Sequence, residues 1–233
     1  MFSTIWHTFF FDPIYNGIVF LIDVVPHGDA GIAIVLIVII VKVALLPLSI
    51  KAAKTQKLMK EIDPKLKDIK KNISDSQEQA KATMELYKEA GMNPFSSILV
   101  MFIQIPVLIA LYMSVTRGGG VTLPDINIDV LFSFVHVPQT VSMHFLGFID
   151  ITKKSLPLAI LAGIAQFAQG YFVFPKLPPR DPNTPASMKD DFARSMQIQM
   201  RYVMPIMIGV IAYTITAVVG LYFIIRSITS IIQ

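Results

Sequence analysis

The feature that most constrains this chain is residues 31–50, GIAIVLIVIIVKVALLPLSI, an almost wholly apolar run with a single charge, Lys42. Twenty residues of α-helix rise about 30 Å, which is the thickness of a bilayer's hydrocarbon core. Lys42 would lie about 18 Å along the helix from Ala30, near the middle of the membrane. A charge at that depth costs on the order of 3 kcal/mol. The run therefore predicts a transmembrane helix in which the lysine has a function.

Composition places the rest of the chain in a membrane as well. The 233 residues are 54% hydrophobic and only 15% charged, whereas a soluble domain carries about 25% charged residues. The absence of cysteine excludes disulfides, zinc–thiolate sites and thiol catalysis. The sequence has no nucleophile elbow, phosphate-binding loop or HExxH motif. We therefore expect a multi-span membrane protein that is not an enzyme and uses no nucleotide or metal cofactor.

The distribution of charge predicts the orientation in the membrane. Residues 51–90 hold ten lysines against seven acidic residues, and residues 1–27 hold no Lys or Arg. The positive-inside rule then puts the basic segment in the cytoplasm and the N-terminus outside. Apolar residues recur at helical spacing within this segment, and Asp63-Pro64 has the form of a helix cap with a first turn. With a turn at 72–76 and a stop at Gly91, the segment predicts a helical hairpin.

The N-terminal segment is rich in aromatic residues on one helical face, Phe2, Trp6, Phe9 and Phe10. The apolar stretch that follows, between two aspartates, is too short to cross a bilayer. The pattern favours an amphipathic helix lying in the membrane interface. The alternative is an ordinary N-terminal helix packed on the bundle.

Further apolar runs predict a second span that carries Gln104 and is interrupted there and at Pro106, and a third span that carries Gln166 and Gln169. The stretch 202–233 is about 48 Å long as one helix, which is too long for an untilted span, and its halves are each about 24 Å long. A single span would place Arg226 at the outer interface, whereas a hairpin turning near Thr214–Thr216 would bury it. Physical arguments leave both topologies open.

The candidate site residues follow from these positions. The absence of carboxylates inside the spans argues against a cation channel or a proton-coupled pump. Lys42 and, in the hairpin topology, Arg226 suit an anionic or polar guest instead. The three glutamines could be interhelical hydrogen-bond partners, although their depth favours a site shared with Lys42. The basic hairpin is either a solvated face that orients the protein and touches anionic lipid or a partner-binding surface, with candidate residues Lys57, Lys60, Lys65, Lys67, Lys70 and Lys71.

Four stretches of the sequence match a known family: GIAIVLIVIIVKVALLPLSIKAAKTQKLM (31–59), ELYKEAGMNPFSSILVMFIQIPVLIALY (85–112), LPLAILAGIAQFAQ (156–169) and MPIMIGVIAY…GLYF…SITSIIQ (204–233). In their order and spacing they resemble the YidC/Oxa/Alb membrane protein insertases, over about 200 residues. The chain looks like a minimal bacterial form, without a large periplasmic domain.

The resemblance implies an all-α integral membrane protein, with five transmembrane helices around a hydrophilic groove. It also implies that the C-terminal stretch forms two spans. The chain is then a multi-pass protein of the bacterial plasma (inner) membrane, with its N-terminus outside and its C-terminus in the cytoplasm. The expected organisation is an external interfacial helix (1–28), a first span (29–50), a cytoplasmic helical hairpin (51–91), a second span (93–116), an external loop (117–154), a third span (155–175), a cytoplasmic loop (176–200) and two final spans (201–214 and 216–233).

The resemblance also implies a mechanism. The groove of this family opens to the cytoplasm and to lipid, and a basic residue on its first span attracts the polar tail of an incoming protein. Lys42 stands at that position, where the family usually has arginine, and Gln104 and Gln169 match two of the family's glutamines. Arg226 stands where a small polar residue is usual, and we hypothesise that it supplements Lys42.

The implied partners are nascent membrane proteins and the lipid bilayer, with the Sec translocon, the signal recognition particle machinery and the ribosome as candidate partners, and no nucleic acid read directly. Two rival functions stay open at this point. A small-anion transporter would predict paired repeats with broken helices, and the sequence shows no internal repeat. A structural assembly factor for membrane complexes would tolerate the loss of Lys42.

Overall fold

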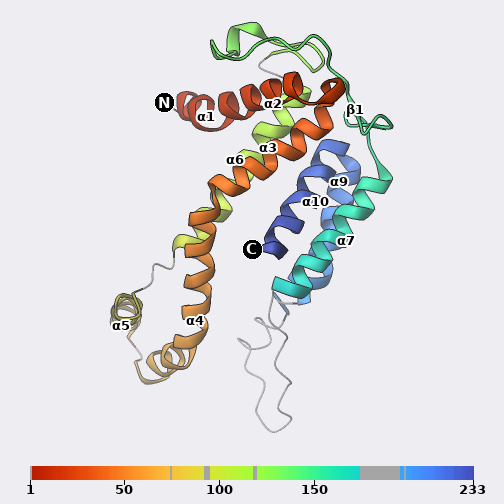
Figure 1. The fold of residues 1–233 in the computed structure, drawn as a ribbon. Helices are drawn as coiled ribbons and strands as arrows, with labels where there is room; N and C mark the ends of the chain where they lie inside the picture. The colour runs from red at the N-terminus through yellow and green to blue at the C-terminus, as the bar shows by residue number, and fades with distance from the viewer. Residues whose placement is uncertain (1, 74, 92–94, 118–119, 174–194, 197) are drawn as a thin grey trace. The chain divides into compact units, whose positions relative to one another are not determined.

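The computed structural model in Figure 1 describes residues 2–73, 75–91, 95–117, 120–173, 195–196 and 198–233. The chain divides into two compact units. Unit 1 comprises residues 1–42 and 107–233, and unit 2 comprises residues 43–106. Most of the expected cytoplasmic loop at 176–200 lies outside the described residues.

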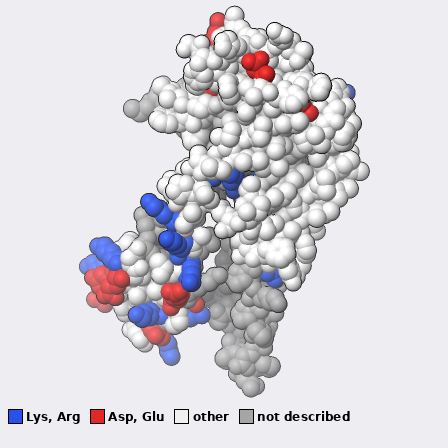
Figure 2. Space-filling model, in the orientation of Figure 1, with Lys and Arg blue, Asp and Glu red and all other residues white. Residues whose placement is uncertain are grey.

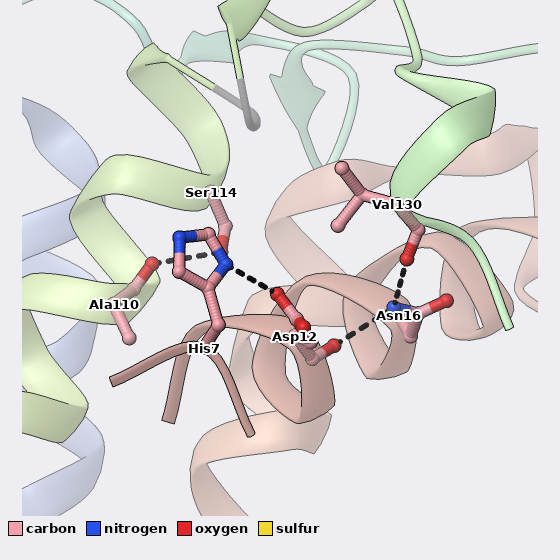
Figure 3. A network of polar contacts seen from close by, with 6 residues as sticks. All are labelled: His7, Asp12, Asn16, Ala110, Ser114 and Val130. Carbon is pink, nitrogen blue, oxygen red and sulfur yellow. Dashed lines mark hydrogen bonds and ion pairs between the residues drawn. The ribbon is translucent and has the colours of Figure 1, made fainter. Parts of the chain in front are cut away.

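Unit 1 begins with a helical run made of α1 (Phe2–Trp6), η1 (His7–Phe11) and α2 (Asp12–Val24). Figure 3 shows how its polar side chains are held. The side-chain amide of Asn16 donates to the carbonyls of Asp12 (2.9 Å) and Val130 (3.0 Å), and its oxygen accepts from the backbone N–H of Phe132 (2.6 Å). His7 contacts the Asp12 carboxylate at 2.9 Å, and Ser114 donates to the carbonyl of Ala110 at 2.7 Å.

These bonds fix α2 against the loop that follows α6. The hydroxyl of Tyr15 adds another, accepting from the backbone N–H of Asn127 at 2.9 Å. A small core of Phe11, Tyr15, Val19 and Val135 fills the space between the helix and the loop. Because buried polar groups and apolar side chains both cross this contact, α2 and the loop form one body.

The loop itself holds little regular structure. It contains η4 (Ile128–Val130) and a two-stranded antiparallel sheet of β1 (His144–Phe145) and β2 (Ile149–Asp150), in which His144 pairs with Asp150 and Phe145 with Ile149. The Asp150 carboxylate accepts from Thr152 and pairs with Lys153 at 2.9 Å. The hydrogen bond from the Thr152 side chain, followed by that from Lys153, lowers the pKa of Asp150 to about 2, so this carboxylate is ionised at every physiological pH.

After η2 (Pro26–Gly28), helix α3 (Ala30–Ala44) carries the first half of the 31–50 run. It packs on α2, where a Cβ on Gly17 would come within 2.6 Å of Ile37. The helix ends at Ala44, and α4 begins at Leu46, so that Leu45 alone separates the two helices. Pro47 lies in the first turn of α4. Proline lacks an N–H and disturbs the preceding turn, which accounts for the break at Leu45.

The rest of unit 1 is a cluster of three helices, α7 (Leu156–Val173), α9 (Met204–Thr214) and α10 (Ala217–Ile232), which lie side by side in Figure 1. A short helix, η5 (Gln199–Val203), leads into α9. Gly163 and Gly209 face each other where α7 and α9 cross: a Cβ on Gly163 would lie 3.3 Å from the Pro205 carbonyl, and one on Gly209 3.4 Å from that of Ala159. Small residues are what allow membrane helices to approach this closely.

The chain breaks between α9 and α10 at Ile215–Thr216, so the stretch 202–233 forms two helices rather than one. Thr216 has an extended backbone, and the N–H of Ala217 donates to the carbonyl of Lys153 at 2.8 Å. A bond to a loop outside the hairpin thus stabilises the break.

Unit 2 contains α4 (Leu46–Asn72), α5 (Ser76–Glu89) and the first half of α6 (Phe95–Thr116). The hairpin of α4 and α5 has a small core of Ile62, Leu66 and Leu86. Asp75 caps α5 by accepting from two backbone N–H groups, and Gly91 follows its end with a positive φ of 63°. The expected cytoplasmic hairpin is therefore present as a structural element.

Two expectations about proline are wrong. Asp63-Pro64 does not begin a helix, because α4 continues through Pro64 to Asn72. Proline inside a helix costs about 3 kcal/mol or more, and the packing of Ile62 and Leu66 on α5 outweighs that cost. Pro106 likewise lies inside α6 and does not interrupt it.

Among the described residues, two helical stretches are long and apolar enough to cross a membrane, Ser3–Val24 and Leu156–Val173. Helix α3 and the first part of α4 would make a third if they act as one broken span, and Phe102–Thr116 and Ala217–Ile232 are shorter apolar helices. The N-terminal helix thus has the length to span, while its bonds join it to the loop at 126–135.

Candidate functional site

The last turns of α10 are polar, although the helix is otherwise apolar. They carry Arg226, Ser227, Thr229 and Ser230. Thr229 and Ser230 donate back to carbonyls of their own helix, Thr229 to Ile225 at 2.7 Å and Ser230 to Arg226 at 2.8 Å. Such bonds satisfy a hydroxyl without a partner helix. The serines, three residues apart and so on the same face of α10, also have contacts on two neighbouring helices.

Ser230 of α10 contacts Lys42, the single charged residue of α3. The Lys42 ammonium donates to the Ser230 hydroxyl at 3.3 Å, and that hydroxyl in turn donates to the carbonyl of Arg226. The positive charges of Lys42 and Arg226 are close enough to repel each other. The structure gives neither cation an ion pair with a carboxylate among the residues it describes. Both side chains are half-buried.

One turn earlier on the same face, Ser227 of α10 contacts Gln166 of α7. The Ser227 hydroxyl donates to Oε1 of Gln166 at 3.3 Å, and both residues are buried. Gln169 lies one turn further along α7. Its Oε1 is also buried, and no hydrogen-bond donor reaches it from the part of the chain that the structure describes. A buried acceptor left in this state is costly, so Gln169 has a hydrogen-bonding capacity that the described chain does not use.

We call Lys42, Arg226, Ser227, Ser230, Gln166 and Gln169 the polar patch of unit 1. It draws on three helices that are otherwise apolar. In such surroundings the two cations and the unused acceptor favour a water-accessible cavity or a polar guest over contact with lipid tails.

The structure brings together four of the five predicted site residues within unit 1. The fifth, Gln104, lies half-buried on the part of α6 that belongs to unit 2. It makes an interaction within the protein, and its place relative to Lys42 is not described.

The hairpin lysines lie on the surface of unit 2. Lys57, Lys65, Lys67 and Lys71 are exposed, and Lys67 pairs with Asp63 at 2.8 Å one helical turn away. The side chains of Lys60 and Lys70 lie outside the described residues. Figure 2 shows basic and acidic atoms intermixed on this hairpin, whereas the visible face of unit 1 is mostly uncharged. The hairpin is therefore a mixed-charge, solvated surface.

Two sets of residues escaped the sequence reasoning. Ser227 and Ser230 belong to the polar patch, and no local signal in the sequence indicates them, because serine is tolerated in any membrane helix. The other is Asp29, which is 5% exposed. Its carboxylate accepts from the backbone N–H groups of Ile32 (3.0 Å) and Leu146 (2.7 Å). Nothing in the sequence indicates the second bond, because its donor is 117 residues away.

Asp29 belongs to a contact that covers the start of α3. The N–H of Ala30 donates to the carbonyl of Ser142 at 2.9 Å. The N–H of Ser142 donates to the carbonyl of Gly28 at 2.8 Å. Gly31 leaves room for the Phe145 ring, which a Cβ would approach to 2.6 Å. The loop at 142–146 thus seals this end of α3, twelve or more residues from Lys42.

Comparison with known proteins identifies the family of this chain. The model of the family described as 60Kd inner membrane protein matches residues 21–233. The chain is 31% identical over 235 residues to the membrane protein insertase YidC of Oceanobacillus iheyensis, covering 98% of this chain and 82% of the relative. It is also 31% identical over 179 residues to YidC of Clostridium tetani (76% and 71%) and 32% identical over 207 residues to YidC of Fusobacterium nucleatum (88% and 84%).

The fold also matches a solved structure, an active YidC insertase with its first transmembrane domain resolved. The TM-score is 0.56 at 21% identity, and the match covers 95% of this chain and 45% of the solved one. The chain thus spans less than half of that protein. With its helical fold, its apolar helices and a family match over most of its length, this chain belongs to the YidC family of membrane protein insertases.

Proposed function

We propose that this chain inserts newly made membrane proteins into the bacterial inner membrane through a hydrophilic groove lined by α3, α7 and α10. The observation that carries the proposal is the double contact of α10, whose Ser230 meets Lys42 of α3 and whose Ser227 meets Gln166 of α7. Hydrogen bonds between serine and glutamine are common between membrane helices, but charged residues such as Lys42 and Arg226 are rare there and mark a functional site.

In this mechanism the cations of the groove attract the polar or acidic tail of an incoming protein. A carboxylate about 4 Å from an ammonium gains about 4 kcal/mol at an effective dielectric constant of 20. That gain is similar to the cost of about 3 kcal/mol for a charged residue at mid-membrane. Lys42, with Arg226 beside it, would therefore offset the barrier to the tail. The apolar segment behind the tail then moves into lipid, and no covalent bond changes.

The glutamines would serve the same guest. No donor within the described ranges reaches the acceptor of Gln169, so in this proposal it accepts from an N–H of the incoming backbone. The role of Gln104 stays a prediction from the resemblance to the family. The break between α3 and α4 before Pro47 would favour contact with water at that point of the chain.

The proposed topology has five spans, with the N-terminus outside and the C-terminus inside. The loop at 117–154 then faces outward, which agrees with the seal that Asp29 and Ser142 make over the start of α3. The helix at 1–28 lies in the outer interface, since its polar bonds go to that same loop. The basic hairpin faces the cytoplasm, where it receives nascent membrane proteins and their targeting machinery: the signal recognition particle pathway, the Sec translocon and the ribosome.

The test is reconstitution of the purified chain into liposomes, with a single-span substrate that has a short acidic tail. Protease protection of the tail measures its transfer. Lys42→Ala should reduce the transfer rate about fivefold or more, as the loss of about 1 kcal/mol would. Lys154→Ala is the matched control, because Lys154 is exposed on the loop outside the polar patch.

The rival functions give different results in the same liposomes. A small-anion transporter would release trapped anions without moving the tail. A structural assembly factor would show the same substrate transfer with Lys42→Ala as with the parent chain. Either result would refute the groove mechanism and leave the family membership intact.

A further inference from the structure

A second feature of unit 1 has no part in the polar patch. It is an open groove of about 650 Å³ between α7 and the segment formed by η5 and α9. Its lining is almost wholly apolar. The groove is lined by Leu156, Ala159, Ile160, Gly163, Ile164, Phe167, Tyr202, Pro205, Ile206, Gly209, Val210 and Tyr213.

The sequence explains why a groove forms there. On α7, Ile160, Ile164 and Phe167 recur at helical spacing and are all exposed, and on α9 Ile206 and Val210 do the same. Between these two walls the helices meet through Gly163 and Gly209. The large side chains of α7 and α9 therefore form two walls, and the two glycines, which have no side chains, form the floor of the groove between them.

One end of the groove carries a charge. Tyr171 continues the α7 wall one turn beyond Phe167, and the Arg201 guanidinium carbon lies 5.7 Å from the centre of its ring. Phe167 and Tyr202 close the same end, with ring centres 6.0 Å apart. A guanidinium on a tyrosine face keeps its N–H donors at the ring's edge. The Arg201 cation therefore stacks on Tyr171, one turn of α7 beyond the groove residue Phe167.

The dimensions suit one lipid chain. The wall from Tyr171 to Ile160 rises about 17 Å, and half of a bilayer's hydrocarbon core is about 15 Å. Gln169, by contrast, projects from the opposite side of α7, since the helical spacing turns it about 180° from Ile160. The groove and the polar patch therefore face different surroundings.

We propose that this groove binds an anionic phospholipid, with its phosphate at Arg201 and an acyl chain along the Gly163–Gly209 floor. Arginine matches the geometry of phosphate oxygens, tyrosines favour the depth of lipid headgroups, and basic pockets between membrane helices bind anionic headgroups. The proposed topology enters only in assigning the lipid to the cytoplasmic leaflet. The site itself does not depend on the insertase mechanism.

The experiment uses tryptophan fluorescence, because the chain has a single tryptophan. In a Trp6→Phe background, Tyr202→Trp places the reporter in the groove. The protein is reconstituted in phosphatidylcholine vesicles containing increasing fractions of phosphatidylglycerol or phosphatidylcholine brominated on the acyl chains. Half-maximal quenching should need about fivefold less brominated phosphatidylglycerol than brominated phosphatidylcholine. Fivefold is the factor that one basic residue contributes to the binding of anionic lipid at a membrane surface.

Three variants control the result. Arg201→Gln should abolish the preference for phosphatidylglycerol, whereas Arg117→Gln, which removes an exposed charge elsewhere in unit 1, should keep it. A reporter at Leu161, exposed on α7 but outside the groove, should show no preference. Melting temperatures show whether each variant is folded.

Equal quenching by the two brominated lipids in the parent reporter would overturn the proposal. So would an equal loss of preference in Arg201→Gln and Arg117→Gln. If a transmembrane peptide displaces the brominated lipid, the groove belongs to the inserted protein, and the lipid assignment is wrong. None of these outcomes affects the liposome transfer assay, so the two proposals fail separately.

Discussion

The polar patch holds two positive charges, Lys42 and Arg226, and one of them is hydrogen-bonded to the Ser230 hydroxyl. Ser230 accepts from Lys42 and donates to the backbone of Arg226. Their mutual repulsion raises the energy of the empty patch, and an anionic tail would relieve it. The two cations should therefore act together rather than independently.

A double substitution tests this coupling. If Arg226 supplements Lys42, transfer of an acidic tail by Lys42→Ala plus Arg226→Ala should be about fivefold slower than by Lys42→Ala alone, the effect of about 1 kcal/mol. The measurement is the initial rate of protease protection in liposomes. Equal rates in the single and double variants would show that Arg226 has no part in transfer.

Asp29 gives a prediction about stability rather than transfer. Asp29→Ala removes a buried acceptor of two backbone N–H groups, at a cost of about 2–4 kcal/mol. Hydrogen exchange at the Leu146 amide should speed up, and the melting temperature should fall. Asp125→Ala, at an exposed position of the same loop, is the control. Unchanged exchange at Leu146 would show that the seal does not depend on this carboxylate.

The sequence predicts residue roles as far as local spacing and charge carry them. Lys42 is conspicuous because it is the only charge in an apolar run. Asp29 is not conspicuous in the sequence, since the second N–H that donates to its carboxylate is in a loop more than a hundred residues away. Ser227 and Ser230 are inconspicuous for another reason: serine is tolerated in any membrane helix, and only contact with α3 and α7 distinguishes them.

At the scale of elements, close packing through glycine holds the three-helix cluster of unit 1. Gly163→Leu would force a side chain against the Pro205 carbonyl, which already lies 3.3 Å from the Cβ position. Overpacking of this kind costs about 1–3 kcal/mol, so the melting temperature of the solubilised protein should fall.

The control for this prediction adds bulk to the same helix at an exposed position. Leu161→Phe should leave the melting temperature close to that of the parent chain, because Leu161 is 51% exposed. Equal melting temperatures for both variants would mean that the glycine contact is not what holds α7 and α9 together.

Elements were predictable where the signal is local. Gly91 and the turn at 72–76 mark the ends of the hairpin helices as expected. Pro64 misled because its local cost is outweighed by packing between α4 and α5, which periodicity alone cannot evaluate. The break before α10 has no Gly-Pro signal, and its bond partner is the carbonyl of Lys153, so physical reasoning from the sequence left it open.

At the scale of the whole molecule, the proposed topology can be mapped directly, because the chain has no cysteine of its own. Single cysteines at Gln77 in the hairpin and at Asp129 in the loop, both exposed, provide the two reporters. In intact cells a membrane-impermeant thiol reagent should label Asp129→Cys and not Gln77→Cys, and permeabilised cells should label both. The reverse pattern would invert the topology and place the hairpin outside.

In the proposed mechanism, positive charge at position 42 draws polar tails into the membrane. The direct measurement depletes a bacterial cell of its own insertase and supplies this chain with Lys42, Lys42→Arg or Lys42→Glu. The readout is insertion of substrates that differ only in an acidic or a basic tail. For the acidic tail, Lys42→Arg should match the parent, and Lys42→Glu should fall about tenfold or more, as the loss of about 1.4 kcal/mol would. Insertion of the substrate with the basic tail should fall much less with Lys42→Glu. Equal insertion of both tails by all three chains would contradict the account.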